Sequence, residues 1–575
     1  MFRHVLLVTA LCLVTFFAGL GRSAIGDADE AFYAQSAREM VEQGDWTTPH
    51  YNYEYRFQKP VFFYWMVAVA YKVAGVSEAA ARFPSALAGL ALALMTWAIG
   101  RRWVGTMVGV VGGAIVATSF GYFTIAHASL PDLPLAAFIT LATWALFEAG
   151  ATALDATAAA SSRGTAAAAP DDRTRRLWML LAGLAIGIGM LTKGPVALVV
   201  PALVYLSARL VMAEGLLPTR RGWFGLRWID VALAAGVLLA VSLPWFLAMA
   251  DVHGIAYLRR FFVGENLERF ATERYNGRRP LWFYAPIIFG GLAPWSSLMV
   301  LWFPSLGRVL RGVRRLTALE WCLILWALVP VLFYTLSVGQ QPRYILPVLP
   351  PLAVLVARTL VSRVEASEAE GRRHRGVAVA ITVSAVAFLA LAFLLFRARP
   401  LLFALSPLAG QVGTAIIVVA AIGLLGWTWF GRQRALPAAI AMAAAATFAT
   451  LQFTFFSSGG PEPVQLMARR LLAVRHGEPS GTYRMFVRNL VFYTGVKQND
   501  LVDEAEAVEF LRQPRRVLVV MPLKLVEGLQ RDHGLQLHRL ASFVYFNPSA
   551  VRLRTLFKQQ PEQALETVVL VANQP

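Results

Sequence analysis

The sequence predicts a polytopic α-helical membrane protein with about thirteen spans, followed by a small α/β domain outside the membrane. Hydrophobic residues make up 57% of the 575 positions and charged residues only 15%, whereas a soluble domain carries about 25% charged residues. Apolar runs long enough to cross a bilayer recur through residues 1–456, and the composition changes from about residue 457. These observations exclude an ordinary soluble protein.

The first apolar run, residues 5–21, follows Arg3 and His4 and has the pattern of a signal peptide. We interpret it as an uncleaved first span, because a basic start suits the inner side of a protein with many spans. Residues 60–74 are apolar but short, so we expect a juxtamembrane helix in the interface. The predicted spans cover about residues 5–21, 84–100, 103–123, 132–149, 176–192, 195–212, 229–249, 281–303, 317–337, 344–361, 375–396, 408–430 and 435–456.

The arginines test this arrangement, because short inner loops of membrane proteins are rich in basic residues. With the N-terminus inside, every inner loop is basic, and an odd number of spans puts the C-terminus outside. The net charge of +19 is therefore explained without nucleic acid. Cys12 and Cys322 lie in apolar helices, which argues against a disulfide or a metal site. The inner basic groups are Arg101 and Arg102; Arg173, Arg175 and Arg176; Arg220, Arg221 and Arg227; Arg308, Arg311, Arg314 and Arg315; Arg372, Arg373 and Arg375; and Arg432 and Arg434.

Two segments outside the spans differ in character. Residues 151–175 are rich in Ala, Thr and Ser and predict a flexible inner linker. Residues 457–575 begin with a Ser-Ser-Gly-Gly-Pro break and contain the β-branched runs TYRMFV, RRVLVVM and TVVLVAN. The stretch DEAEAVEFLRQ predicts an amphipathic helix. Because this domain has no glycine-rich phosphate loop and no metal-spaced cluster, we predict a capping or docking role for it.

The outer loop at residues 22–83 carries the most informative residues, because it is polar, charged and aromatic between two spans. Asp29 and Glu30 either cap the helix that follows or face a cavity, where Asp29 would contact a sugar or the attacking group. Lys59 lies close to Tyr55 and either reaches the lipid head groups or binds a phosphate. Arg82, at the end of the loop, is a further candidate for phosphate binding.

Other candidates fall on the same predicted outer side. Asp132 lies at the outer start of a span, where an acid is either a cap or a site residue. Lys193 ends another span and anchors it or contacts a lipid phosphate. The outer loop at residues 251–280 contains several arginines, among them Arg269. The preference of basic residues for inner loops does not explain arginines on the outer side, so they favour a site for anionic ligands. Arg343 and Tyr344 stand at the outer mouth of a span, as interface anchors or as site residues.

Together these segments resemble one family. The stretches DEAFYAQSAREMVEQGDWTTPHYNYEYRFQKPVFFYW, LTKGPVALVVP, ENLERF and PRYILPVLPPLA are similar to the bacterial aminoarabinose–lipid A transferases. That family lies within the polyprenyl-phosphate-sugar glycosyltransferases, which include the protein O-mannosyltransferases. The likeness covers Asp27 to about Ala353. Two departures are Gln58, where that branch usually has Glu, and PRYILP, where relatives often have LPTYILP.

The resemblance implies a GT-C fold, with residues 1–456 as the catalytic membrane domain and residues 457–575 as a periplasmic α/β domain. It implies transfer of 4-amino-4-deoxy-L-arabinose from undecaprenyl phosphate to a phosphate of lipid A, a lipopolysaccharide modification that gives polymyxin resistance. The expected location is the bacterial inner membrane, with a cytoplasmic N-terminus and a periplasmic site. The partners would be the donor lipid, the acceptor lipid and membrane lipids. The sequence shows no strong metal signature, but some GT-C relatives use a divalent ion, so a divalent metal ion stays an open alternative.

On this resemblance we expect Asp29 and Asp132 to be catalytic. The remaining alternatives are transfer to a polysaccharide, hopanoid or protein hydroxyl, a transporter of lipid-linked sugars, and a non-catalytic scaffold. A transporter should show internal repeats and interrupted helices, and the sequence shows no repeat. The sequence does not identify the sugar, the acceptor or the oligomeric state. The expected substrate-binding residues are Glu30, Tyr55, Lys59, Arg82, Lys193, Arg269 and Tyr344.

Overall fold

The computed structural model describes most of the chain. Residues 151–170 of the linker predicted at 151–175 lie outside the described residues, as do the predicted inner arginines Arg220 and Arg221 and residues 457–460 of the predicted break. The last part of the linker prediction is wrong, because residues 172–175 belong to the helix Asp172–Lys193, which Asp171 caps. The described residues are 1–27, 29–150, 171–212, 222–223, 226–273, 277–402, 406–456, 461–485, 487–545, 553–558 and 560–575.

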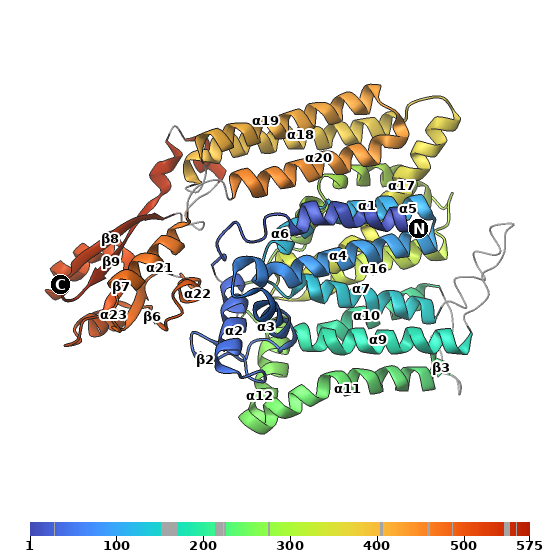
Figure 1. The fold of residues 1–575 in the computed structure, drawn as a ribbon. Coiled ribbons are helices and arrows are strands. Elements are labelled where there is room, and N and C mark those ends of the chain that lie inside the picture. The colour runs from blue at the N-terminus through green and yellow to red at the C-terminus, as the bar shows by residue number, and fades with distance from the viewer. Residues whose placement is uncertain are drawn as a thin grey trace.

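A bundle of long apolar helices forms the body of the molecule (Figure 1). Among the described residues, nine helices are long and apolar enough to cross a bilayer, or eleven if each of two bent pairs counts as one span. The helices of the bundle are α1 (Phe2–Cys12), α4 (Glu78–Trp103), α5 (Thr106–Ala117), α6 (Phe120–Ala126), α7 (Asp132–Ala149), α9 (Asp172–Lys193), α10 (Val196–Val211), α11 (Trp228–His253), α14 (Tyr284–Gly291), α15 (Phe303–Leu310), α16 (Ala318–Leu336), α17 (Leu349–Ala369), α18 (Arg375–Ala398), α19 (Pro407–Phe430) and α20 (Leu436–Thr450).

Every predicted span meets a helix in the described residues, but not every one is straight or long. The segments 2–17 and 196–211 are apolar and shorter than the others, so the count of thirteen stays a prediction. The expected span at 281–303 is two helices bent by 118°, and the one at 103–123 is bent by 53°. In the first case Pro294 interrupts the helix, because proline has no N–H to donate to the preceding turn.

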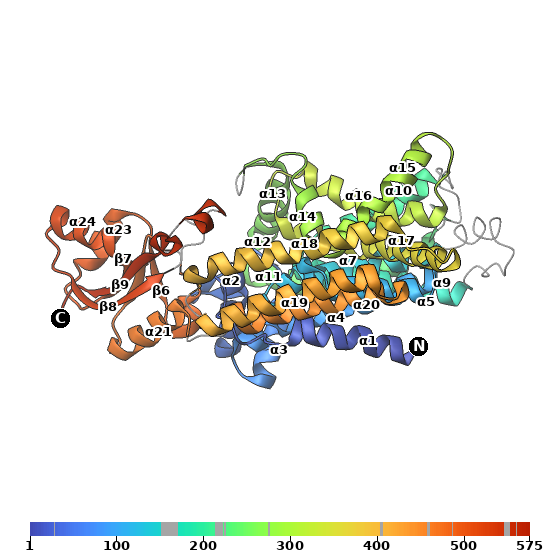
Figure 2. The ribbon, with the colours of Figure 1, turned by 90° about the horizontal axis from the view of Figure 1, so that it is seen from above.

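Short elements gather at one end of the bundle. Figure 1 places α2 (Asp29–Gln43), α3 (Phe62–Ala74) and α12 (Ile255–Arg259) there, next to the C-terminal domain, while the N-terminus lies at the opposite end. A chain that crosses the membrane an odd number of times, as predicted, has its two termini on opposite sides. α3 has 13 residues, about 20 Å of helix, and runs across the bundle (Figure 2), as expected for a juxtamembrane helix. The strands β1 (His50–Tyr51) and β2 (Glu54–Tyr55) pair as a hairpin beside α2, and β3 (Gly222–Trp223) pairs with β4 (Leu226–Arg227).

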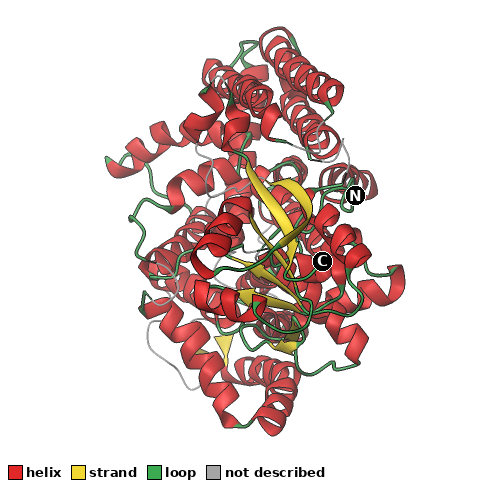
Figure 3. Cartoon of the chain, turned by 90° about the vertical axis from the view of Figure 1, so that its left-hand side faces the viewer, coloured by secondary structure: helices red, strands yellow, loops and turns green. Residues whose placement is uncertain are grey.

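The C-terminal domain is built on a five-stranded mixed sheet, seen in front of the bundle in Figure 3. The strand order is β6-β5-β7-β9-β8, with β5, β6 and β7 parallel and β9 antiparallel to β7 and β8. Alternate residues of β7 face opposite sides: Leu518 packs toward α21 and Val519 toward α23. The elements are α21 (Pro463–Val474), β5 (Ser480–Tyr483), α22 (Leu490–Thr494), β6 (Gln498–Leu501), α23 (Glu504–Leu511), β7 (Leu518–Pro522), α24 (Leu523–His533), β8 (His538–Tyr545) and β9 (Glu566–Ala572).

The three predicted β-branched runs correspond to β5, β7 and β9, and the predicted amphipathic helix is α23, opened by a capping box of Asp503 and Glu506. The sequence did not reveal β6 or β8. Hydrogen bonds join this domain to the loop at residues 22–83: Asn489 Nδ2 donates to Ile25 O (2.8 Å) and Asn52 Nδ2 donates to Gln498 O (2.8 Å). The domain is therefore docked on the segment that carries the candidate residues.

Candidate active site

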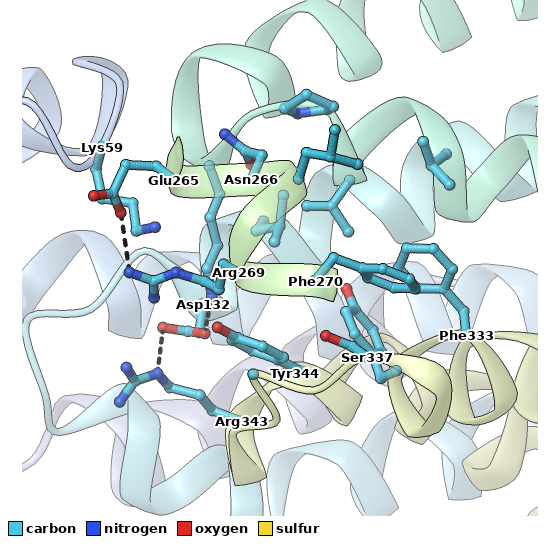
Figure 4. A pocket seen from close by; sticks show the side chains of 18 of the residues that line it. Lys59, Asp132, Glu265, Asn266, Arg269, Phe270, Phe333, Ser337, Arg343 and Tyr344 are labelled. Carbon is cyan, nitrogen blue, oxygen red and sulfur yellow. Dashed lines mark hydrogen bonds and ion pairs between the residues drawn. The ribbon is translucent and has the colours of Figure 1, made fainter. Parts of the chain in front are cut away.

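A cavity of about 370 Å³ is lined in part by the ends of bundle helices, among them the end of α9 at Lys193. This end of α9 lies on the side of the bundle that carries the C-terminal domain (Figure 1). One side is charged, with Lys59, Asp132 and Arg269, and the other side is aromatic, with Phe270 and Phe333 (Figure 4). Lys193, which pairs with Asp132, also lines the cavity. The cavity is therefore amphipathic: it suits a molecule with an anionic head and an apolar tail. Its charged residues come from five separate segments: the loop before α3, the start of α7, the end of α9, the segment at residues 260–271 that includes α13 (Arg269–Ala271), and the turn at Pro342–Val348.

Two glycines fix the backbone around the charged side. Gly194 has φ +98 and ends α9 directly after Lys193; a Cβ there would meet the Phe261 ring at 2.9 Å. Gly339 lies against the segment that carries Arg269, and its N–H donates to Arg269 O (3.1 Å). A Cβ at Gly339 would meet that carbonyl oxygen at 2.5 Å. The chain next to Lys193 and next to Arg269 therefore makes close contacts, with the Phe261 ring and with the Arg269 carbonyl oxygen respectively, that a residue with a Cβ would disturb.

Ion pairs link Asp132 to two cations. Lys193 Nζ lies 2.5 Å from Asp132 Oδ1, and Arg343 Nε lies 3.2 Å from Asp132 Oδ2. Only 3% of the Asp132 side chain is exposed, so this carboxylate is enclosed by its partners. Lys193 Nζ also stands 4.5 Å from the centre of the Tyr344 ring. This arrangement makes Asp132 the counter-ion that positions Lys193 and Arg343.

Asp29 differs from Asp132 in its access to solvent. Its side chain is 47% exposed, and its Oδ2 accepts a hydrogen bond from Arg343 Nη2 at 2.5 Å. Burial favours the neutral acid, but Arg343, with Lys193 and Arg56, holds the pKa of the Asp29 carboxyl below its usual value. Asp29 does not line the cavity itself. Arg343 joins it to the cavity by bridging the two acids.

Lys59 is the half-buried cation of the cavity whose charge is least compensated. Among the described residues no carboxylate forms an ion pair with it, whereas Arg269 Nη2 pairs with Glu265 Oε2 at 3.0 Å. Burial lowers the pKa of Lys59 to about 7, and the nearby cations Arg269 and Lys193 act in the same direction. An anion bound in the cavity would stabilise the protonated form of Lys59 and so offset the free-energy cost of burying its charge.

The acids of the cavity do not suit a divalent metal ion. Asp132 is paired with Lys193 and Arg343, and Glu265 is paired with Arg269. Over the described ranges, no group of three or more His, Cys, Asp and Glu side chains is placed to hold a metal. Because each carboxylate already has a cation partner, we derive no chemical step through a metal here.

Three of the predicted substrate-binding residues lie away from the cavity. Glu30 and Arg82 form a buried ion pair, with Arg82 Nε 2.7 Å from Glu30 Oε1. The same carboxylate accepts from the N–H groups of Gly26 (2.6 Å) and Ser129 (2.9 Å). Arg82 also donates to the carbonyl oxygens of the chain just after α1. Tyr55 is 63% exposed; its ring stacks on Phe57 and meets the His253 ring edge-on.

We therefore expect Arg82→Met to destabilise the protein by about 3–5 kcal/mol, because it strands the Glu30 carboxylate without its partner. Thermal unfolding of the purified protein in detergent measures this loss. The control is Lys497→Met, which removes an exposed pair with Glu54 (2.8 Å) and should cost less than about 1 kcal/mol. Equal unfolding temperatures for both variants would contradict the structural role of Arg82.

Comparison with known proteins shows the family to which this chain belongs. The family model described as dolichyl-phosphate-mannose-protein mannosyltransferase matches residues 6–258. An undecaprenyl phosphate-α-4-amino-4-deoxy-L-arabinose arabinosyl transferase of Pseudomonas aeruginosa is 34% identical over 371 residues, which are 64% of this chain and 61% of that protein. Its counterpart in Edwardsiella ictaluri is 30% identical over 429 residues, 74% of this chain and 70% of the relative. The chain belongs to this arabinosyl transferase family.

Solved structures agree on the fold. The crystal structure of ArnT from Cupriavidus metallidurans bound to undecaprenyl phosphate has a TM-score of 0.72 at 21% identity, over 99% of this chain and 98% of that chain. An oligosaccharyltransferase of Archaeoglobus fulgidus has a TM-score of 0.51 at 11% identity, over 92% of this chain and 70% of the other. The likeness in fold therefore includes the C-terminal domain as well as the helix bundle. The sequence match to the Pseudomonas relative spans 61% of that protein.

Within this arabinosyl transferase fold the cavity collects Lys59, Asp132, Lys193, Arg269 and Tyr344, all predicted from the sequence. Their individual roles stay predictions. The sequence left Arg343 open between an interface anchor and a site residue, and we did not place it among the expected site residues. Glu265 and Asn266, which also line the cavity, were not named. A signal was available for Arg343, since it directly precedes Tyr344 in a turn expected on the same side as Asp29.

Proposed function

We propose that this chain is an integral-membrane glycosyltransferase that moves 4-amino-4-deoxy-L-arabinose from undecaprenyl phosphate to a phosphate of lipid A, and so contributes to polymyxin resistance. The family membership supports the sugar and the donor. The observation that carries the proposal is the amphipathic cavity, which is lined by the cations Lys59, Lys193 and Arg269 and has an aromatic wall at Phe270 and Phe333 (Figure 4). Such a cavity suits a lipid phosphate, because the cations take the phosphate and the rings take the first apolar units of the tail.

The transfer breaks the bond between the anomeric carbon of the sugar and an oxygen of the donor phosphate. A new bond forms between that carbon and an oxygen of the acceptor. Undecaprenyl phosphate leaves with the electron pair of the broken bond, so negative charge grows on its phosphate. Lys59, Lys193 and Arg269 stand where they can stabilise that charge, which is the largest kind of contribution a fixed site makes. No acid is needed to protonate this leaving group.

The state of Asp29 favours an acceptor that is already ionised. A carboxylate held by Arg343, with a lowered pKa, is a weak general base and a poor choice for activating a hydroxyl. A phosphate of lipid A needs no such activation. We propose that Asp29 instead binds the amino group of the sugar through charge pairing, while Asp132 holds Lys193 and Arg343 in place. The buried ion pair of Glu30 with Arg82 holds the start of α2, next to Asp29, in place. The role of Tyr55 as a substrate contact stays a prediction.

We propose an inner-membrane location with a cytoplasmic N-terminus and a periplasmic site. The basic inner loops support this orientation, as does the docking of the C-terminal domain at the cavity end of the bundle. Both substrates are membrane lipids, so each can enter sideways from the bilayer.

Mass spectrometry of lipid A tests the proposal. The host should make the aminoarabinose donor but lack its own transferase, and it should express either the wild-type chain or Asp29→Asn. We expect aminoarabinose on lipid A with the wild type and little or none with the variant. Unmodified lipid A in cells that contain well-folded wild-type protein would contradict the proposed donor and acceptor.

A further inference from the structure

A second, polar cavity of about 260 Å³ lies between the loop at residues 22–83 and the C-terminal domain. It is separate from the amphipathic cavity, but Gln58 lines the second cavity and the next residue, Lys59, lines the first. Its charged and polar lining comes from both sides: Arg56 and Gln58 belong to the loop, whereas Thr482, Arg488 and Asp500 belong to the C-terminal domain. We name it the interdomain cavity.

Two arginines of this cavity share one aromatic ring. The Arg56 guanidinium lies 4.0 Å from the centre of the Phe32 ring, and that of Arg488 lies 5.5 Å from the same centre. Within the described part of the chain, no carboxylate forms an ion pair with Arg56, whose Nε donates only a long hydrogen bond to Tyr64 Oη at 3.4 Å. Two guanidinium groups gathered on one ring repel each other, and a phosphate between them would turn that repulsion into paired hydrogen bonds.

The interdomain cavity also contains side-chain oxygen atoms that can accept hydrogen bonds from a ligand. The Gln58 Oε1 atom is buried without a hydrogen-bond partner. The Asp500 side chain is exposed, and its Oδ1 accepts only a 3.3 Å hydrogen bond from Thr482 Oγ1 among the described residues. These oxygens suit hydroxyl or ammonium groups. A ligand that offers both a phosphate and such donors is a phosphorylated sugar.

The position relative to Asp29 connects this cavity with the transfer. Phe32 follows Asp29 by three residues on α2, so the two side chains lie on neighbouring turns of one helix face. Arg56 is also close enough to help keep Asp29 ionised. A headgroup held over Phe32 would therefore lie beside the carboxylate that we assign to the sugar, on the side where the C-terminal domain closes over it.

We propose that the interdomain cavity binds the phosphorylated sugar headgroup of the acceptor, with Arg56 and Arg488 holding one of its phosphates. The C-terminal domain then takes part in acceptor selection. The proposal rests on the proposed function for the identity of the reaction, but the binding site itself does not depend on which sugar is transferred.

Kinetics with the full-length protein in nanodiscs test the inference. With saturating donor and varied lipid A, Arg488→Gln should raise the acceptor KM at least tenfold, and Arg488→Lys should recover part of the loss. The Kd for undecaprenyl phosphate should not change. The backbone contacts of Arg488, with Asp27 Oδ1 (2.8 Å) and Tyr51 Oη (3.0 Å), persist in both variants. Arg531→Gln, which removes an arginine 76% exposed on α24, is the control. A wild-type acceptor KM in Arg488→Gln would overturn the proposal.

Direct binding separates this inference from the proposed function. Glucosamine 1-phosphate serves as a soluble headgroup probe, and its affinity for the wild type, Arg488→Gln and Arg531→Gln is measured without any donor. We expect at least a tenfold loss in Arg488→Gln only, even if the protein transfers a sugar other than aminoarabinose. Equal affinity in all three proteins would overturn the inference while leaving the transfer intact. Inorganic phosphate that binds as tightly as the sugar phosphate would overturn the ligand class.

Discussion

Asp29→Asn is expected to lower the transfer rate by about 10²–10³-fold while leaving the fold and the binding of undecaprenyl phosphate intact. The substitution keeps the shape of the side chain but removes the charge that pairs with Arg343 at 2.5 Å and, in our proposal, with the sugar amine. Single-turnover assays with purified protein and labelled donor measure the rate. Glu42→Gln is the matched control, since Glu42 lies on the same helix and pairs with Arg38 instead. Near-normal turnover in Asp29→Asn would remove Asp29 from the mechanism.

The role of Arg343 can be separated from simple packing through the pH profile. Arg343 keeps the Asp29 pKa low, so Asp29 is ionised well into the acidic range in the wild type. Arg343→Gln removes that cation, raises the pKa of Asp29, and should move the acid limb of the rate profile to higher pH. In Arg343→Lys the acid limb of the pH–rate profile should stay close to its wild-type position. An unchanged limb in Arg343→Gln would show that ionisation of Asp29 does not control the rate.

Apolar runs and loop arginines predicted much of this fold because the bilayer imposes strong constraints on both. Long apolar runs within the bilayer had to form helices, and the short loops on the inner side had to be basic. The same reasoning placed Asp29, Lys59, Asp132, Lys193 and Tyr344 at one end of the bundle, where the structure has them. It did not predict the 118° bend at residues 292–294, since a proline in an apolar run shows only that the helix can be interrupted.

Charge partners were beyond the reach of sequence reasoning. Arg82 and Glu30 are 52 positions apart and bury each other, yet in the sequence each resembles a charge that lines a cavity. Arg343 and Asp29 are 314 positions apart, and only the fold brings them together. A charged residue beside a span can serve a ligand or another residue, and the difference depends on long-range packing that one sequence does not encode in any local pattern.

Lys59→Gln is expected to weaken the binding of undecaprenyl phosphate by about 10- to 100-fold, because a hydrogen bond to a charged group contributes about 1.5–3 kcal/mol. The substitution removes a cation that has no carboxylate partner among the described residues, so it leaves no stranded acid behind. Lys72→Gln provides the control: Lys72 is exposed near the end of α3 and lies over the Trp46 ring. Tritiated or fluorescent undecaprenyl phosphate in detergent micelles gives the Kd. Equal affinity in the two variants would place the phosphate elsewhere.

The lowered pKa of Lys59 adds a pH dependence with a definite sign. In the empty cavity Lys59 loses its proton around pH 7, whereas a bound phosphate favours the protonated form. Binding above pH 7 therefore requires the uptake of a proton, and the Kd should rise by up to about tenfold per pH unit between pH 7 and 9. Below about pH 6 the phosphate loses its second charge and affinity falls again. Lys59→Arg stays charged throughout this range, so its Kd should be nearly flat from pH 7 to 9. A wild-type profile as flat as that of Lys59→Arg would show that Lys59 is already charged in the empty cavity.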